Sequence, residues 1–443
     1  MAIKTPKYEL IDKIFVGLLL VVFGGIVLHA PLSIGFGALL PDSAVLIKTW
    51  KEILLIIATL LGAVILTRRK QWGIVRQPIV LLIGVYALLH ILLLPLFWGG
   101  VATALAGLII DLRYLLFFVL IYGAMQLYPG LRRVFIGVFT GGALVVVTFA
   151  LLQVFVLPPD ILSYIGYNET TIMPYLTVDQ NIDYIRINST LRGPNPLGAY
   201  AVIVLSLLLA YWIKGKHTQF KRPMFIVTIL GVGGLVALWA SYSRSALLAG
   251  IAAIALVVLL TVGRRLSKWT WISIWVTLFA LGGIFIAARD TEFVSNVVLH
   301  ENREEGGEVN SNDGHIDSLV DGVARVVRQP LGSGIGSTGS ASLYGDNPVI
   351  IENQYLFTAH ESGWIGIVLF LMISFKVLAR LWKQRNDWLS LGVLASGIGM
   401  LLIGLLLPVW VDDTVAIIWW GLAAIAIGGT YERAINKTPK RTA

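Results

Sequence analysis

The sequence predicts an all-α integral membrane protein, and three observations lead to this fold class. First, 57% of its 443 residues are hydrophobic and only 13% are charged, whereas soluble domains carry about 25% charged residues. Second, apolar runs of roughly 18 residues or more recur along the whole chain, and each can cross about 30 Å of hydrocarbon. Third, most of the 34 lysines and arginines lie between these runs. We therefore expect one polytopic membrane domain over residues 1–443, without cysteine for a disulfide or a thiolate metal site.

About twelve runs are predicted to form transmembrane helices. In chain order they lie near 13–30, 50–67, 78–97, 105–127, 134–156, 195–213, 223–240, 246–262, 270–287, 358–378, 389–408 and 414–430. The first run follows Lys4 and Lys7, but the many spans behind it favour a retained helix over a cleaved signal peptide. The fourth run contains Asp111 and Arg113, which we interpret as a buried ion pair.

The distribution of lysine and arginine predicts the orientation. These residues concentrate in the two tails and in alternate linkers, near 68–76, 129–133, 214–222, 261–268 and 376–385. Because cytoplasmic loops carry the excess of positive charge, an even number of spans places both termini in the cytoplasm. The net charge of +9 is then mostly loop charge that faces anionic lipid headgroups. We do not expect nucleic-acid binding.

The opposite side carries two long polar segments, about 157–194 and 288–357, and the second is the largest loop, between the ninth and tenth helices. Beyond Lys48 and Lys51, this predicted outer half contains no lysine but several arginines: Arg113, Arg186, Arg192, Arg244, Arg289, Arg303, Arg325 and Arg328. The positive-inside bias disfavours lysine and arginine equally. The presence of arginine without lysine therefore indicates that the planar guanidinium group has a specific function on this side. Carboxylate and phosphate match that fork with two hydrogen bonds.

The first outer segment ends with RINSTLRGPNPLGAY (186–200) and leads directly into the sixth helix. Asn195 can cap that helix, whose first N–H groups are free near Arg186 and Arg192. A helix amino terminus beside guanidinium groups is typical of an anion site. The alternative is that the two arginines pair with Asp179 or Asp183.

A second arginine motif, SYSR (241–244), lies where the seventh helix turns into the eighth. Arg244 is surrounded by the hydroxyl groups of Ser241, Ser243 and Ser245, which indicates a polar pocket. The alternative is that Arg244 extends to the lipid headgroups without a specific partner.

The second outer segment begins with an acidic run (301–314) that we expect to be solvated and mobile. Residues 315–328 then predict an amphipathic helix lying against the outer face, because apolar residues recur at helical spacing: Ile316, Leu319, Val320, Val323 and Val327. Asp321 and Arg325 share its polar face with Asp317 and can form a pair four residues apart.

The sequence QPLGSGIGSTGS (329–340) contains a GxGxxG match. No strand precedes it and it lies on the predicted outer side, so we reject dinucleotide binding. Two interpretations stay open, a flexible loop near an active site and a linker.

Candidate general bases lie around residues 351–361, at the outer end of the tenth helix. Glu352 and Glu361 are the stronger candidates, because a carboxylate beside apolar surface has a raised pKa and suits general-base work. A single histidine such as His360 is more often a packing residue. The sequence lacks HExxH, CxxC, GxSxG and Walker A patterns and shows no aspartate cluster at ligand spacing, so we predict no metal and no cofactor.

Four stretches, in this order, resemble the O-antigen ligase and O-antigen polymerase superfamily. RINSTLRGPNPLG looks like its R-x-x-G-T-F-x-x-P-N signature, and SYSRS is similar to its S-x-S-R element. DGHIDSLVDGVARVVRQPLGSGIG resembles the stretch that leads into its P-L-x-G-x-G loop, and ENQYLFTAHESGWIGI looks like its H-N-x-Y-L…E-x-G-x-x-G element. The motifs cover about a fifth of the chain, and the predicted topology covers all of it.

This resemblance implies a function. Members are inverting, metal-independent membrane glycosyltransferases with a GT-C-like fold. They take a glycan from an undecaprenyl-diphosphate carrier at the outer side of the bacterial cytoplasmic (inner) membrane and join it to a hydroxyl of a glycan or glycolipid acceptor. By resemblance, the diphosphate would be bound by Arg186, Arg244 and Arg192, with Asn195, Asn353 and Ser243 in support, and the catalytic residues would be among Glu352, His315 and Glu361.

Two departures refine the expectation. Glu352 stands where ligases carry the histidine that is thought to activate the acceptor, and His315 stands where many members carry an arginine. Polymerase-like relatives often show this Glu/His combination. A capsule or exopolysaccharide polymerase, or a ligase for another acceptor, therefore fits better than lipopolysaccharide ligase. Which of the three residues is the base stays open.

The rival class is a transporter or flippase of lipid-linked glycans, which twelve spans would also suit. Coupled carriers usually place ionisable residues at mid-membrane in discontinuous helices. Asp111 and Arg113 are the only such pair that the sequence reveals. A non-catalytic scaffold, the third class, would need no outer face restricted to arginine.

Overall fold

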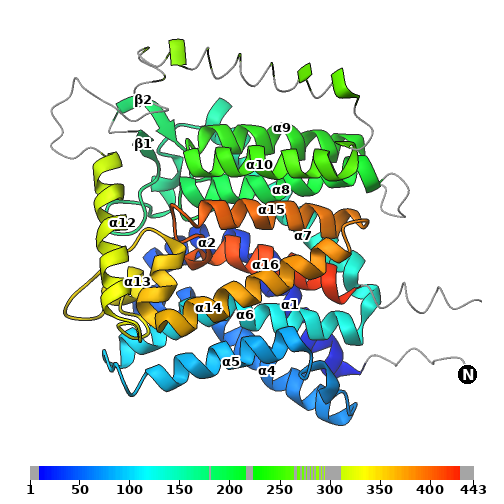
Figure 1. The fold of residues 1–443 in the computed structure, drawn as a ribbon, viewed down its shortest axis with the longest axis vertical. Helices are drawn as coiled ribbons and strands as arrows, with labels where there is room; N and C mark the ends of the chain where they lie inside the picture. The colour runs from blue at the N-terminus through cyan, green and yellow to red at the C-terminus, as the bar shows by residue number, and fades with distance from the viewer. Residues whose placement is uncertain are drawn as a thin grey trace, which may run out of the picture.

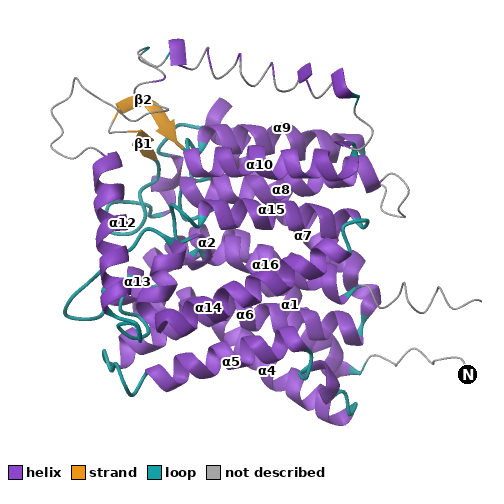
Figure 2. Cartoon of the chain, in the orientation of Figure 1, coloured by secondary structure: helices purple, strands orange, loops and turns teal. Residues whose placement is uncertain are grey.

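The computed structural model describes residues 9–178, 181–215, 223–263 and 311–429, together with scattered positions between 267 and 294. The side chains of the helix that begins at Ser311 are described from Ser318 onward. In this part of the chain the structure is a bundle of long helices lying side by side, with one short two-stranded sheet (Figures 1 and 2).

The amino-terminal half contains α1 (Leu10–Gly25), η1 (Ile26–Leu28), α2 (His29–Leu39), η2 (Pro41–Ser43), α3 (Ala44–Lys48), α4 (Trp50–Arg68), η3 (Trp72–Ile74), α5 (Pro78–Leu93), α6 (Val101–Leu127), η4 (Pro129–Leu131), α7 (Arg132–Phe155), η5 (Ile161–Ile165), β1 (Leu176–Val178) and β2 (Asn181–Arg186). The two strands pair antiparallel, with Leu176 opposite Arg186.

The carboxyl-terminal half contains α8 (Pro194–Lys214), α9 (Met224–Ala240), α10 (Arg244–Thr261), α12 (Ser311–Arg328), α13 (Gly339–Ser342), α14 (Gln354–Lys383), α15 (Trp388–Ile403), η9 (Val409–Val411) and α16 (Asp413–Gly428).

Hydropathy identifies the membrane-spanning candidates in the described part of the chain. Seven stretches of helix are long and apolar enough to cross a membrane, and α5, α9, α15 and α16 are shorter apolar helices. Each coincides with one of the predicted runs, whereas the run near 270–287 falls among residues that are mostly outside the described part. The structure thus confirms an all-α membrane protein, while the number of twelve spans stays a prediction.

Several predicted helices differ from the structure in extent; the third and the eleventh, for example, end at Leu93 and Ile403 rather than near 97 and 408. The first apolar stretch continues to Leu39, through the 3₁₀ turn η1. The tenth, predicted over 358–378, is the 30-residue α14, which is kinked at Gly363 with φ +68°. The kink allows close packing, because a Cβ on Gly363 would lie 2.5 Å from the carbonyl oxygen of Pro330.

Helix α16 lies at the centre of the bundle, with every residue from Thr414 to Gly428 buried. It packs against α6 through small residues: Gly421 faces Phe117 and Gly428 faces Met125. Such small residues let helix backbones approach closely, which is how helices associate in lipid without a hydrophobic driving force. These contacts hold the middle and the end of α16 against α6.

The polar elements β1, β2, α12 and α13 gather at one end of the bundle, on the left in Figure 1, which we call the loop end. Helices α8, α10, α14 and α16 begin there. Ile187, the residue after β2, donates a hydrogen bond from its N–H to the carbonyl oxygen of Ala240 at the end of α9, at 3.1 Å. The loop end corresponds to the predicted outer side, although its orientation in a membrane stays a prediction.

The predicted amphipathic helix is present as α12, which begins four residues earlier than 315. The ion pair expected between Asp321 and Arg325 is confirmed, with 2.7 Å between Oδ2 and Nε. Its packing differs from the prediction, because Val320, Val323 and Val327 are 50 to 64% exposed. The face toward α14 instead contains Gly322, which lies against Leu356, and the Val326 carbonyl, which accepts a hydrogen bond from Trp364 Nε1.

Candidate functional site

Arg186 connects three segments at the loop end. It is the last residue of β2, and its Nε donates a hydrogen bond to the Ser241 carbonyl oxygen at 3.0 Å. A terminal nitrogen of the same guanidinium donates to Asn195 Oδ1, in the first turn of α8, at 2.7 Å. Arg244, three residues after Ser241, is the first residue of α10 and is partly buried. Arg186, Asn195, Ser241 and Arg244 form what we call the arginine assembly.

Two residues near this assembly adopt the left-handed backbone region without being glycine. Ser189 has φ +51° and Tyr242 has φ +45°, a conformation that usually needs support from the surroundings. Ser189 has that support from α7, since its N–H donates to Gln153 Oε1 and its hydroxyl donates to Val146 O, both at 2.7 Å. The loop that leads into α8 is therefore fixed in place.

Gly198 allows α8 to lie directly against the serine-rich turn. A Cβ at this position would lie 2.7 Å from Ala246 Cβ and 2.8 Å from Ser241 Oγ. We predict that Gly198→Ala destabilises the protein by about 1–3 kcal/mol, because the helix must move away from the turn. Thermal unfolding in detergent would measure this loss. Gly84→Ala is the matched control, since Gly84 lies in α5 with open space around it, and equal stability of the two variants would contradict the prediction.

The predicted supporting residues have structural contacts that the sequence did not specify. Asn195 does not cap α8, because its side-chain oxygen accepts from Arg186. Asn353 caps α14 by accepting from the N–H groups of Tyr355 and Leu356, and its own amide donates to Leu405 O at 2.7 Å. Ser243 is the N-cap residue of α10, and its hydroxyl lies 3.2 Å from that of Ser245.

Arg192 is exposed, and its charge acts on Asp412, the N-cap residue of α16. Burial raises the pKa of Asp412, and the nearby guanidinium groups of Arg192 and Arg113 oppose that rise. The contacts described for Arg186 are with neutral groups. Asp183 is exposed, and Asp179 lies outside the described residues. Asp412 was not predicted as a site residue, although its position directly before the last apolar helix was a signal for it.

The three predicted catalytic residues occupy different environments. Glu352 is partly buried, two residues before α14 begins. Glu361 is only 1% exposed, and Oε1 accepts a hydrogen bond from Thr338 N at 3.3 Å. His315 lies in the first half of α12, outside the residues whose side chains are described. Of the two candidates whose side chains are described, Glu352 is therefore less enclosed than Glu361.

The glycine-rich segment 329–340 packs closely between α6 and α14. This packing differs from both interpretations of the sequence, a flexible loop and a linker. Ser333 N donates to His360 O at 2.6 Å, and Trp364 N donates to Pro330 O at 2.9 Å. Gly336 has φ +83°, and a Cβ there would lie 2.4 Å from the Thr103 carbonyl oxygen. The segment therefore fills the space between α6 and the kink of α14, and its N–H groups hold the Glu361 carboxylate.

Ionisable side chains also meet inside the bundle, at positions that the sequence analysis did not connect. Asp413 contacts Arg113, lies 2.8 Å from Lys51 Nζ and lies 3.3 Å from His29 Nε2. Glu52 lies 3.1 Å from the same Lys51 nitrogen. We call these five residues the Asp413 cluster.

Asp111 belongs to a second group, with His90 Nε2 at 3.3 Å and the Glu361 carboxyl close by. The predicted pair of Asp111 with Arg113 is therefore wrong. The two residues are two positions apart on α6, and residues at that spacing do not face each other on a helix.

Removing the central carboxylate of the Asp413 cluster should be strongly destabilising. Asp413→Asn would leave the charges of Lys51 and Arg113 without their main partner, and breaking a buried pair costs about 3–5 kcal/mol. Thermal unfolding would report the loss. The control is Asp321→Asn, whose ion pair with Arg325 is exposed and should contribute about 1 kcal/mol or less. A smaller loss for Asp413→Asn than for Asp321→Asn would contradict this view.

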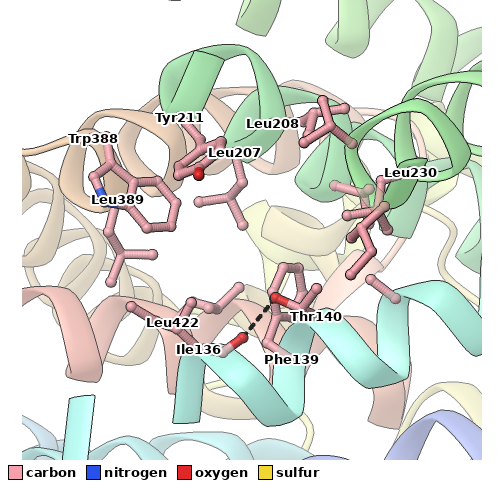
Figure 3. Close-up of a pocket in the computed structure, with 14 residues that line it drawn as sticks. Ile136, Phe139, Thr140, Leu207, Leu208, Tyr211, Leu230, Trp388, Leu389 and Leu422 are labelled. Atoms are coloured by element: carbon pink, nitrogen blue, oxygen red, sulfur yellow. Dashed lines mark hydrogen bonds between the residues drawn. The ribbon is translucent and has the colours of Figure 1, made fainter. Parts of the chain in front are cut away.

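A pocket between α7, α8, α9 and α15 is apolar and is separate from the arginine assembly (Figure 3). Leu207, Leu230 and Trp388 line it, and the hydroxyl of Thr140 donates to Ile136 O of its own helix at 2.8 Å. Its α8 residues begin at Val204, ten positions after the start of the helix, or about 15 Å along it. No charged residue lines the pocket, so it lacks the cations that a diphosphate site would use.

Comparisons with known proteins add no assignment: neither a scan against protein-family models nor a search of curated proteins found a match. Among the described residues, no group of three or more His, Asp or Glu side chains is placed to hold a metal ion.

Proposed function

We propose that this protein is a membrane glycosyltransferase that moves a glycan from a polyprenyl-diphosphate carrier to an acceptor hydroxyl, as a polysaccharide polymerase or as a ligase for a glycan or glycolipid. The observation that carries the proposal is the arginine assembly, in which Arg186 joins the start of α8 to the turn that ends at Arg244. Both arginines come from motifs that resemble the O-antigen ligase and polymerase superfamily.

The backbone of the first motif supports the same proposal. The superfamily signature R-x-x-G-T-F-x-x-P-N carries glycine at the position of Ser189, counted from Arg186. Ser189 has φ +51°, in the region that glycine enters without steric cost. Ser189 is thus in a backbone region that suits glycine, at the position where the signature carries glycine, and this agreement supports the resemblance.

The proposed reaction is an inverting displacement in which the groups of the loop end have distinct roles. Glu352 accepts the proton of the acceptor hydroxyl, whose oxygen forms a bond to the anomeric carbon while the bond from that carbon to the diphosphate oxygen breaks. Negative charge builds up on the departing diphosphate, so fixed guanidinium groups stabilise the transition state more than the bound donor. Arg186 and Arg244 serve this role, with Arg192 nearer to solvent.

The proposal includes a location. Both termini would be cytoplasmic, and the loop end would face outward from a bacterial cytoplasmic membrane, where a lipid-linked glycan can approach through the bilayer. The positive-inside bias of the linkers supports this orientation.

The test is a transfer assay with the purified protein, a polyprenyl-diphosphate-linked oligosaccharide and candidate glycan acceptors. A longer or acceptor-linked glycan, with release of polyprenyl diphosphate, would support the proposal. Movement of the intact donor across a proteoliposome membrane, without glycan transfer, would overturn it and identify a flippase.

The flippase alternative is favoured by one specific observation, the ionisable groups inside the bundle. Charged residues within membrane helices often mark ion or substrate pathways, and the Asp413 cluster combines five such residues from helices distant in sequence. In the proposed transferase, these residues instead brace the start of α16, beside Asp412.

A further inference from the structure

A basic pocket lies at the end of the bundle opposite the loop end, where α14 ends and α5 begins. Its lining includes Gln77, the N-cap residue of α5, with Pro78 at the start of that helix and Tyr122 of α6. It also includes three cations of α14: Lys376, Arg380 and Lys383. The cavity volume of about 310 Å³ is at the lower end of the range for small-molecule sites. We call it the basic pocket.

The three cations are placed to act on one anion. They are four and three residues apart on α14, so they share one helix face. Like charges at this spacing repel each other. Among the described residues, no carboxylate forms an ion pair with any of the three. A bound anion would remove the repulsion.

Helix α5 adds a weaker contribution from the other wall. Pro78 is at its first position, and Gln77 makes no side-chain capping bond. The N–H groups of the first turn therefore carry their partial positive charge toward the residues that line the pocket. Cations that followed only the positive-inside bias would need neither a cavity nor a shared face.

Apolar surface continues from the basic pocket along both helices. Phe375, which lines the pocket, is 72% exposed, and Leu371 on the next turn of α14 is 44% exposed. Leu81 and Val85 of α5 are each 51% exposed, and α5 packs beside α14. Lipid acyl chains would cover these side chains in a membrane, so the basic pocket adjoins the lipid-facing surface of α5 and α14.

We propose that the basic pocket binds the phosphate of an anionic membrane phospholipid, with its acyl chains along α5 and α14. Phosphate groups suit a site with one arginine and two lysines, and basic pockets between membrane helices are known to receive anionic headgroups. This site is separate from the arginine assembly and does not depend on the proposed reaction.

The experiment is native mass spectrometry of the purified full chain in detergent with added phosphatidylglycerol or phosphatidylcholine. The wild type should retain phosphatidylglycerol in preference to phosphatidylcholine. The triple variant Lys376→Gln, Arg380→Gln and Lys383→Gln should retain about tenfold less phosphatidylglycerol than the wild type. The control triple variant Arg68→Gln, Lys70→Gln and Arg133→Gln removes the same charge from residues that do not line the pocket and should retain the lipid. Equal retention by the two triple variants would overturn the proposal.

Two further measurements distinguish lipid binding from misfolding and from binding of a soluble anion. If its elution profile or thermal unfolding shows that the pocket triple variant is misfolded, the single variant Arg380→Gln replaces it. This variant should retain several-fold less phosphatidylglycerol than the wild type. Phe375→Ala should also weaken retention several-fold, and millimolar inorganic phosphate should not displace the lipid. Complete displacement by inorganic phosphate, with no effect of Phe375→Ala, would identify a site for a soluble anion and overturn the lipid assignment.

Discussion

Glu352→Gln is expected to lower the rate of glycan transfer by about 10²- to 10⁴-fold, the usual contribution of a general base. The substitution keeps the shape of the side chain and removes its ability to accept a proton. Glu352 is favoured because it is partly buried and lies just outside α14, whereas Glu361 is enclosed and held by backbone N–H groups of the glycine-rich segment. Initial rates with the lipid-linked donor, at saturating acceptor, measure the effect.

Glu361→Gln and His315→Asn complete the comparison. Glu361→Gln should reduce thermal stability more than Glu352→Gln, because Glu361 braces the segment between α6 and α14. If Glu361→Gln instead abolishes transfer at unchanged stability while Glu352→Gln is active, the base is Glu361. Near-normal transfer rates for all three variants would show that none of these residues is the general base, and would weaken the glycosyltransferase proposal.

The helices were predictable from sequence because the hydrocarbon of a bilayer restricts the conformations that the backbone can adopt. Polar backbone groups in a bilayer must be satisfied within the segment, so a long apolar run becomes a helix. Helix ends were less predictable where distant residues decide them. The kink at Gly363 depends on Pro330, which lies more than 30 positions earlier, and hydropathy contains no trace of that contact.

The candidate site was predictable in part. The two arginine motifs place Arg186 shortly before one helix and Arg244 at the start of another. The structure joins the motifs through Ser241 and Asn195. The hydrogen-bond partners of Arg186 were not predictable. Every residue has a backbone carbonyl oxygen, so the sequence does not show which one accepts a hydrogen bond. The same holds for Arg113 and Asp413, which are far apart in the sequence and meet only because α6 packs on α16.

Arg244→Lys is expected to lower the transfer rate nearly as much as Arg244→Ala, by roughly a hundredfold. A diphosphate held by the guanidinium fork accepts two parallel hydrogen bonds, whereas lysine offers a point charge without that fork. Losing a charged hydrogen bond that forms mainly in the transition state costs on the order of 3 kcal/mol. The measurement is transfer from a purified polyprenyl-diphosphate donor, together with the detergent-extracted yield of each variant.

The comparison of lysine with alanine separates the two interpretations of Arg244. If the side chain only extends toward lipid headgroups, lysine should replace it fully, because both side chains reach the headgroups with the same charge. Arg325→Lys is the matched control, since Arg325 forms an exposed pair with Asp321 on α12, and its rate should stay close to the wild type. Folding of the Arg244 variants should be retained, because the residue is only partly buried at the start of α10. A fully active Arg244→Lys protein would exclude Arg244 from diphosphate binding and leave Arg186 as the arginine on which the site depends.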